Sequence, residues 1–196
     1  RLGSKHVRCG YEQPHKATLK GYAMVILIAG ASHVGKTLLA QCMLERYGVP
    51  YLSIDHLKMG LIRSGNTDLT PDDDDALTEY LWPIVREMVK TAIENGQNLV
   101  VEGCYVPPHW RRDFEEQYLR SIEFVCLAMS DAYINAHIGE IREHACAVET
   151  RLDDSGCTLG ALREDNRRCI DAFAECNEKV TIIESDFEAT IETVLD

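Results

Sequence analysis

The chain has 196 residues, of which 45% are hydrophobic, and this size and composition suit one α/β domain with a packed core. The formal net charge of -12 argues against a general nucleic-acid binder, because neutralising backbone phosphates requires a surplus of Lys and Arg. No C-x-x-C pair occurs among the eight cysteines, and no apolar run is long enough to span a bilayer. We therefore expect a soluble cytoplasmic protein with free thiols, either a monomer or a homodimer.

Residues 1–23 differ in charge from the rest of the chain. Five basic residues against one acid give this leader a net charge of +4, which leaves -16 for residues 24–196 to make the total of -12. The leader has no periodic apolar face and does not start with Met. We expect it to lie outside the folded domain, as a disordered tail or a segment foreign to the natural protein, with a presequence or a basic arm as the alternative.

The most informative stretch follows at residues 24–38. An apolar run over residues 25–29 predicts a buried strand, and it leads into the phosphate-loop pattern G-x-x-x-x-G-K-[ST] and then a predicted helix. Two glycines permit a loop whose amides wrap a pyrophosphate, Lys36 can reach the β and γ phosphates, and the Thr37 hydroxyl can ligate the bridging magnesium. A chance Gly-rich turn is the alternative, but the strand-loop-helix context favours a nucleotide site. The predicted nucleotide-binding residues are Gly30, Ala31, Ser32, His33, Val34, Gly35, Lys36, Thr37 and Leu38.

A second buried strand is predicted over residues 51–54, and Asp55 follows it directly. Ligands of doubly wound sheets bind beyond the carboxyl ends of the strands, so Asp55 is expected at the same edge as the phosphate loop. A carboxylate there can orient an acceptor hydroxyl and take its proton. The alternative is that Asp55 only caps a helix beginning near Leu57. Lys58 and Arg63 are candidates for holding an anionic acceptor, or else ordinary surface cations.

The next helix is predicted to start at Thr70 and Pro71, with the acids at 72–75 in its first turn. It is expected to bend at Pro83 and to stop at residues 95–96. A third strand over residues 98–101 then ends at Glu102, the candidate for a second acid that holds magnesium directly or through water. The alternative is a carboxylate that only satisfies local loop amides.

The second half of the chain supplies two more strands and the candidate lid. A strand is predicted over residues 122–128, and the apolar stripe over residues 131–152 predicts an amphipathic helix. Arg142, an acceptor candidate, and Arg151 stand off that stripe and would point to opposite sides of a continuous helix. Arg151 is the candidate catalytic residue, because it precedes a predicted hinge at 153–156 and an arginine on a closing lid can stabilise the transferring phosphoryl group. A further helix, a strand over 180–184 and a closing helix over 187–195 follow.

Residues 24–196 resemble the small P-loop kinases related to nucleoside monophosphate kinases, shikimate kinase, zeta-toxin kinases and 2-phosphoglycerate kinase-like proteins. The resemblance rests on four motifs, which are GASHVGKT at 30–37, SID at 53–55, VVEG at 100–103 and RLDD at 151–154. It implies the three-layer α/β fold of P-loop NTPases, with a five-stranded parallel sheet in the order 2-3-1-4-5 flanked by helices. It also implies ATP and Mg²⁺ as cofactors, an acceptor segment over about residues 55–95 and a helical lid over about residues 138–163.

Two departures bear on the acceptor. Adenylate kinases follow their acid-Gly pair closely with Pro-Arg, whereas Glu102-Gly103 leads to Val106-Pro107-Pro108 without an adjacent arginine, and the position of their acceptor arginine holds Lys58 at best. These differences favour a small hydroxyl-bearing metabolite over a nucleoside monophosphate. Neither a guanine-reading N-K-x-D motif nor an L-S-G-G-Q-type signature occurs. We therefore predict an Mg-ATP-dependent small-molecule kinase, with an adenylate-type kinase or an ATP-binding regulatory module as alternatives.

Overall fold

A computed structural model describes residues 24–144 and 157–195. The leader at 1–23, Arg151 and the expected hinge at 153–156 lie outside the described residues. No helix in the described part of the chain is both long and apolar enough to cross a membrane. The elements, in chain order, are β1 (Val25–Gly30), α1 (Lys36–Tyr47), β2 (Tyr51–Ser53), α2 (Ile54–Arg63), α3 (Asp74–Glu94), β3 (Leu99–Glu102), η1 (Trp110–Asp113), α4 (Glu116–Leu119), β4 (Ile122–Met129), α5 (Asp131–His144), α6 (Leu159–Glu175), β5 (Val180–Ile183) and α7 (Phe187–Leu195).

The five strands form one parallel sheet in the order β2-β3-β1-β4-β5, which confirms the predicted topology. Strand β1 lies in the middle, where Val25 is in register with Leu99 of β3 and with Ile122 of β4. All six residues of β1 are buried, as expected for a central strand covered on both faces. The carboxyl ends of β1, β2 and β3 therefore meet at one edge of the sheet.

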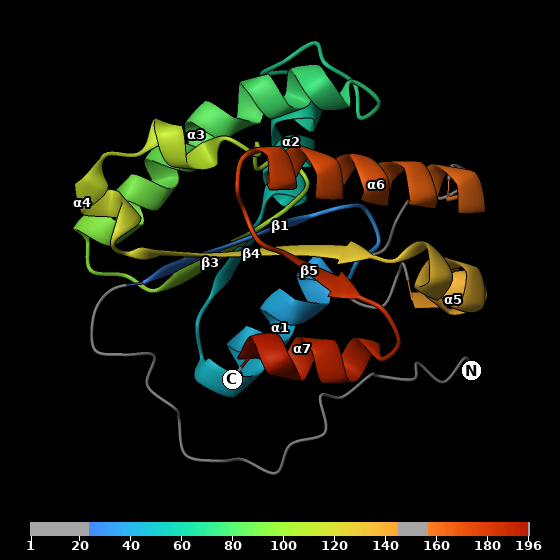
Figure 1. Cartoon of the computed structure of the whole chain (residues 1–196). Helices are drawn as coiled ribbons and strands as arrows, with labels where there is room; N and C mark the ends of the chain where they lie inside the picture. The colour runs from blue at the N-terminus through green and yellow to red at the C-terminus, as the bar shows by residue number, and fades with distance from the viewer. Residues whose placement is uncertain (1–23, 145–156, 196) are drawn as a thin grey trace, which may run out of the picture.

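Helices cover both faces of the sheet (Figure 1), because alternate side chains of each strand point to opposite faces. On one face, Ile26 and Ile28 of β1 pack in a core with α1, α5 and α7. On the other face, Val25 and Leu27 pack in a core with α3, η1 and part of α6. Each fully buried Leu or Ile stabilises the fold by about 1.5–3 kcal/mol, and the two cores together hold the strand ends in place.

The structure corrects the predicted start of α2. This helix begins at Ile54 rather than near Leu57, so Asp55 lies in its first turn and Ser53 occupies the N-cap position without a side-chain capping bond. Ile54 is fully buried and prolongs the apolar run of β2, which is why the sequence pattern assigned it to the strand. The alternative interpretation of Asp55 as the cap is therefore wrong, because the residue is already helical.

The start of α3 also differs from the prediction. The helix begins at Asp74, and Thr70 does not cap it; instead the amide and the hydroxyl of Thr70 both donate to Asp73 Oδ2 at 2.7 Å. These bonds close a turn ahead of the helix and lower the pKa of Asp73. From Asp74 the helix runs through Pro83 as one element and ends at Glu94, beside the predicted stop at residues 95–96.

Candidate active site

The phosphate-loop sequence forms a tight connection between β1 and α1. Gly30, His33 and Gly35 have positive φ angles of 142°, 65° and 82°. A Cβ on Gly30 would lie 2.1 Å from the carbonyl oxygen of Leu127, and one on Gly35 would lie 2.5 Å from the ring of Phe187, so neighbouring elements leave room only for glycine. His33 adopts the left-handed conformation without being glycine, which is a sparsely populated state that surrounding structure must stabilise.

Lys36, the first residue of α1, is buried at the centre of this region. Its Nζ donates to the carbonyl oxygen of Ala31 at 2.6 Å and to Cys104 Sγ at 3.1 Å. Burial by itself would lower the pKa of the ammonium, but Cys104, Glu102 and Asp55 together outweigh that effect and raise the pKa above its ordinary value. Lys36 is therefore a cation at neutral pH, and it lies within electrostatic reach of both carboxylates that the sequence placed at this edge.

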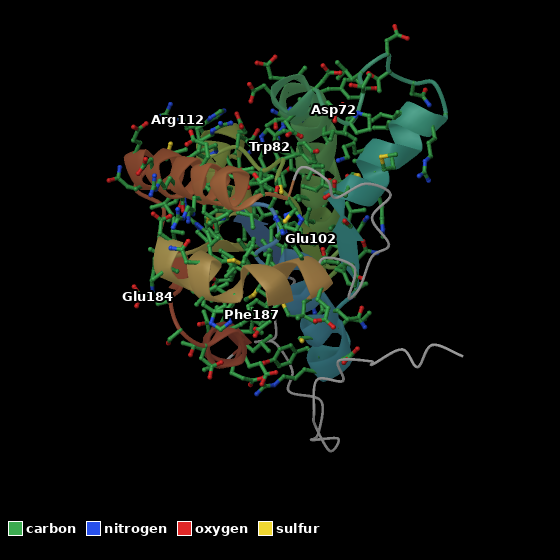
Figure 2. All side chains as sticks on the ribbon, turned by 90° about the vertical axis from the view of Figure 1, so that its right-hand side faces the viewer. Asp72, Trp82, Glu102, Arg112, Glu184 and Phe187 are labelled. Carbon is green, nitrogen blue, oxygen red and sulfur yellow. The ribbon has the colours of Figure 1, made fainter. Side chains whose placement is uncertain are left out.

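Glu102 ends β3 directly beside the strand that carries the loop. It is in register with Ile28, and the amide of Gly103 donates to the Ile28 carbonyl at 3.1 Å. Figure 2 shows Glu102 in the interior of the molecule, where it is only 1% exposed, whereas Asp72 of the acidic run lies at the surface.

The residues at this edge fit a magnesium ion that is held partly by phosphates. Thr37, in the first turn of α1, is half-buried, and together with Glu102 it offers the hydroxyl and carboxylate oxygens that Mg²⁺ prefers. No group of three or more His, Cys, Asp or Glu side chains suited to a metal occurs in the described residues. This donor set therefore suits Mg²⁺ that takes its remaining ligands from nucleotide and water rather than a metal caged by protein alone.

Asp55 belongs to a network that links three parts of the chain. Asp55 Oδ1 pairs with Lys58 Nζ at 2.7 Å, and Lys58 Nζ also donates to the hydroxyl of Tyr105 at 2.8 Å. The Tyr105 hydroxyl in turn donates to Asp74 Oδ1 at 3.1 Å. Burial, followed by the charges of Asp55 and Asp74, raises the pKa of Tyr105 above its ordinary value, so this hydroxyl keeps its proton. The ammonium of Lys58 is thus already shared between two groups of the protein.

Two other predicted basic residues, Arg63 and Arg142, lie apart from this network. Arg63 is exposed at the end of α2. Arg142 Nε donates to the carbonyl oxygen of Cys157 at 2.8 Å, so Arg142 ties α5 to the chain just before α6. Arg151 lies outside the described residues. Of the predicted acceptor residues, only Lys58 is thus placed beside Asp55.

Three residues at the site were not identified from the sequence, namely Cys104, Tyr105 and Asp165. Cys104 and Tyr105 come directly after Glu102-Gly103, at the strand edge where polar side chains are expected to gather, so their position was an available signal. Asp165 comes from α6 and accepts a hydrogen bond from the backbone amide of Ser32. No local pattern points to that contact, because the two residues are 133 positions apart.

Solved structures with a similar fold include a gluconokinase, a shikimate kinase and a sugar kinase. A gluconokinase from Sinorhizobium meliloti matches with a TM-score of 0.54 and 17% identity over 90% of this chain and 91% of that chain. A shikimate kinase from Bacteroides thetaiotaomicron matches with a TM-score of 0.53 and 13% identity over 87% of this chain and 95% of that chain. A sugar kinase from a Janibacter species matches with a TM-score of 0.51 and 17% identity over 88% and 92% of the two chains. At these identities the likeness shows the fold.

The sequence itself identifies the family. A comparison with curated proteins gave no match. Residues 23–145, more than half of the chain, match the family model described as chloramphenicol phosphotransferase-like protein. The matched segment includes the phosphate loop, Asp55 and Glu102. The chain therefore belongs to the chloramphenicol phosphotransferase-like family, whose members are P-loop small-molecule kinases.

Proposed function

We propose that the protein transfers the γ-phosphate of Mg-ATP to a hydroxyl group of an uncharged small molecule. The observation that carries this proposal is the convergence of three residues at one sheet edge, since Lys36 opens α1 after β1, Asp55 follows β2 and Glu102 ends β3. The charges of Glu102 and Asp55 both raise the pKa of Lys36. A cation for phosphate, an acid for magnesium and a carboxylate for the acceptor are the groups that phosphoryl transfer requires.

On the nucleotide side, the amides of residues 30–38 bind the phosphates and Lys36 neutralises their charge. Thr37 and Glu102 would hold Mg²⁺, directly or through water; when bound, this ion neutralises charge on the phosphates. The contact between Ser32 and Asp165 supports an anion-binding loop, because a loop amide already donates to a carboxylate oxygen at 2.6 Å. Arg151, on the proposed lid over residues 138–163, would stabilise the transferring phosphoryl group.

On the acceptor side, Asp55 acts as the general base. The acceptor oxygen forms a bond to the γ-phosphorus, the bond from that phosphorus to the leaving ADP oxygen breaks, and the hydroxyl proton passes to the Asp55 carboxylate. The acceptor segment comprises about residues 55–95 in this proposal. Arg142 is not part of it, because its contact with Cys157 gives it a structural role between α5 and α6.

The charge around Asp55 supports an uncharged acceptor. Lys58 is shared between Asp55 and Tyr105, so it is not available as the basic residue that a phosphate or carboxylate on the acceptor would need. Within this network, the two carboxylates of Asp55 and Asp74 exceed the single positive charge of Lys58, and Lys36, a second cation near Asp55, is assigned to the ATP phosphates. The remaining negative charge disfavours an anionic acceptor. A nucleoside monophosphate is therefore a poorer candidate than a neutral alcohol.

The test is ADP release by purified protein with Mg-ATP and a panel of acceptors. The panel contains phenicol antibiotics, aminoglycosides, neutral sugars, nucleosides, sugar acids and nucleoside monophosphates. We expect acceptor-dependent release with a neutral alcohol and its loss in Asp55→Asn. Glu116→Gln is the matched control. It neutralises a carboxylate that pairs with Arg120 on the short exposed helix α4, and this helix lies at the opposite edge of the sheet.

Three outcomes would contradict the proposal. ADP release that is independent of every acceptor, or tight ATP binding without turnover, would favour the alternative of an ATP-binding regulatory module. Turnover restricted to nucleoside monophosphates would instead favour an adenylate-type kinase and would contradict the charge argument.

A further inference from the structure

We propose that Tyr105 and Lys58 are positioning residues, which hold the Asp55 carboxylate in the orientation needed to accept the acceptor's proton. This inference rests on the proposed function, because it assumes that Asp55 is the general base. It gives Lys58 a different role from the acceptor contact that the sequence suggested, and it gives a role to Tyr105, which the sequence did not identify. Neither side chain needs to contact the acceptor in this role.

The hydrogen bonds run in one direction, from the Lys58 ammonium to the Tyr105 hydroxyl and from that hydroxyl to the Asp74 carboxylate. Lys58 Nζ donates both to Asp55 Oδ1 at 2.7 Å and to the Tyr105 hydroxyl at 2.8 Å. Because that hydroxyl accepts from Lys58, its own proton is free for Asp74 Oδ1, which lies 3.1 Å away. The ammonium also lies 5.0 Å from the centroid of the Tyr105 ring, within the range of a cation–π contact. The hydroxyl oxygen and the ring face of Tyr105 thus both contact the Lys58 ammonium and together fix its position.

The burial of the partners shows which one acts as the anchor. Tyr105 is 4% exposed, and the side chains of Lys58 and Asp55 are 12% and 38% exposed. An ion pair three residues apart on a helix is a weak restraint on its own when water reaches one partner, as it reaches the Asp55 carboxylate here. The restraint on Asp55 becomes effective through the buried phenol, which joins α2 to the loop after β3.

Asp74 connects the same network to the start of α3. It lies in the first turn of that helix, so the chain of contacts spans α2, the loop after β3 and α3. These are the elements of the proposed acceptor segment and the strand end that carries Glu102. A shift of any one of them would move the Lys58 ammonium and, with it, the Asp55 carboxylate. Small displacements of a catalytic group have large effects on rate.

The first test is a double-mutant cycle with Tyr105→Phe and Lys58→Met, using the acceptor found in the ADP-release screen. Each single variant is expected to lower kcat by about tenfold or more, while the acceptor KM and the Kd for ATP stay near their wild-type values. If Tyr105 acts through Lys58, the double variant is no slower than Lys58→Met alone. Lys58→Arg, which keeps the charge, is expected to recover part of the lost kcat.

The chain offers a matched control for the tyrosine. The hydroxyl of Tyr118 donates to Glu94, and the ammonium of Lys90 lies 5.4 Å from the Tyr118 ring, so the chemistry is similar but the cluster is at the opposite end of α3. Tyr118→Phe is expected to leave kcat unchanged. Thermal unfolding of each variant checks that a loss of kcat is not a loss of folded protein.

The second test does not depend on turnover. Reductive methylation of lysines, followed by peptide mass spectrometry, measures how readily each amine reacts. Lys58 is expected to react slowly in the wild-type protein and several-fold faster in both Tyr105→Phe and Asp55→Asn, with Lys90 as the internal reference. An unchanged Lys58 rate in Tyr105→Phe would show that the phenol does not hold the ammonium, and would overturn the inference.

The kinetic outcomes separate this inference from the proposed function. Effects of Tyr105→Phe and Lys58→Met that add in the double variant, or that raise only the acceptor KM, would overturn the positioning role while leaving the kinase intact. If the wild-type protein turns over and Tyr105→Phe and Lys58→Met both keep its kcat, the positioning role is also overturned and the kinase assignment stands. Absence of acceptor-dependent turnover in the wild-type protein would overturn the proposed function and the positioning role together.

Discussion

The carboxylate of Asp165 on α6 accepts a hydrogen bond of 2.6 Å from the backbone amide of Ser32 in the phosphate loop. This contact brings a negative charge from a distant helix to the loop that is proposed to bind phosphates. Hydrogen bonds to an ionised acceptor are stronger than neutral ones, so the contact stabilises the loop in the nucleotide-free state. A polyphosphate bound to the same loop would be repelled by this carboxylate.

Neutralising Asp165 is therefore expected to strengthen nucleotide binding. Asp165→Asn should lower the Kd for ATP by about fivefold or more, since removing one like charge near 4 Å is worth about 1 kcal/mol even at the dielectric constant of water, and should lower the Kd for ADP by less. Titration calorimetry measures both constants. Asp171→Asn, at an exposed position of the same helix, is the control and should change neither. Weaker ATP binding in Asp165→Asn would mean that the carboxylate supports the bound form of the loop instead.

Removal of the Lys36 ammonium should weaken both nucleotide binding and the fold. We expect Lys36→Met to raise the Kd for ATP by about 10- to 100-fold, as for the loss of hydrogen bonds from a charged donor. The melting temperature should fall, because the substitution removes the cation that compensates the buried Glu102 carboxylate and takes a hydrogen bond from the Ala31 carbonyl. Lys90→Met, which removes a lysine paired with Glu87 and Glu115, should leave the Kd unchanged. A normal Kd in Lys36→Met would exclude the predicted role of the lysine.

Cys104 gives a chemical test of the same region. Of the six cysteines in the described residues, Cys104 is the exposed one, and its sulfur lies 3.1 Å from Lys36 Nζ. Alkylation by iodoacetamide should therefore place a bulky group against the lysine and abolish ATP binding, and Mg-ATP should slow the reaction at Cys104 but not at Cys176. Cys104→Ser should bind ATP after the same treatment. If alkylated protein, checked by mass spectrometry, binds ATP normally, the site does not include this loop.

Two glycines should respond to substitution in opposite directions. Gly30→Ala forces a Cβ to within 2.1 Å of the Leu127 carbonyl oxygen at a φ of 142°, and it should reduce the free energy of unfolding by about 2 kcal/mol or more. Gly60→Ala, inside α2 with open space around the new atom, should increase it by about 0.5–1 kcal/mol. Urea unfolding measures both values. Equal stability of the two variants would contradict the close approach of β1 and β4.

Much of the fold could be predicted from the sequence because its signals are local. The strand order is confirmed, as is the fully buried β1, and α7 has the predicted bounds of 187–195. The proximity of Lys36 to Asp55 and Glu102 also follows from a local rule, since each acid comes at or directly after the end of a parallel strand. Their chemical roles stay predictions until activity is measured.

What could not be predicted depends on contacts between distant residues. The end of β2 could not be predicted, because Ile54 continues the apolar run of the strand and is buried. A short apolar run fits a strand and a buried helix start equally well. The spacing of Asp55 and Lys58 suits a helical ion pair, but the phenol that holds Lys58 comes from a residue 47 positions away. The sequence left Lys58 open between an acceptor contact and a surface cation, and the structure adds that Asp55 and Tyr105 are its partners.

The strand order also has a consequence for the evolution of this family. The strand that leads into the phosphate loop lies in the middle of the sheet, and the chain of the proposed acceptor segment is attached to β2 and β3 on one side of it. Substitutions in α2 and α3 can accumulate there without altering β1, whose neighbours β3 and β4 hold it along its length. If the proposed acceptor segment is correct, acceptor preference can change through substitutions on one flank of the sheet while β1 and the phosphate loop keep their neighbours.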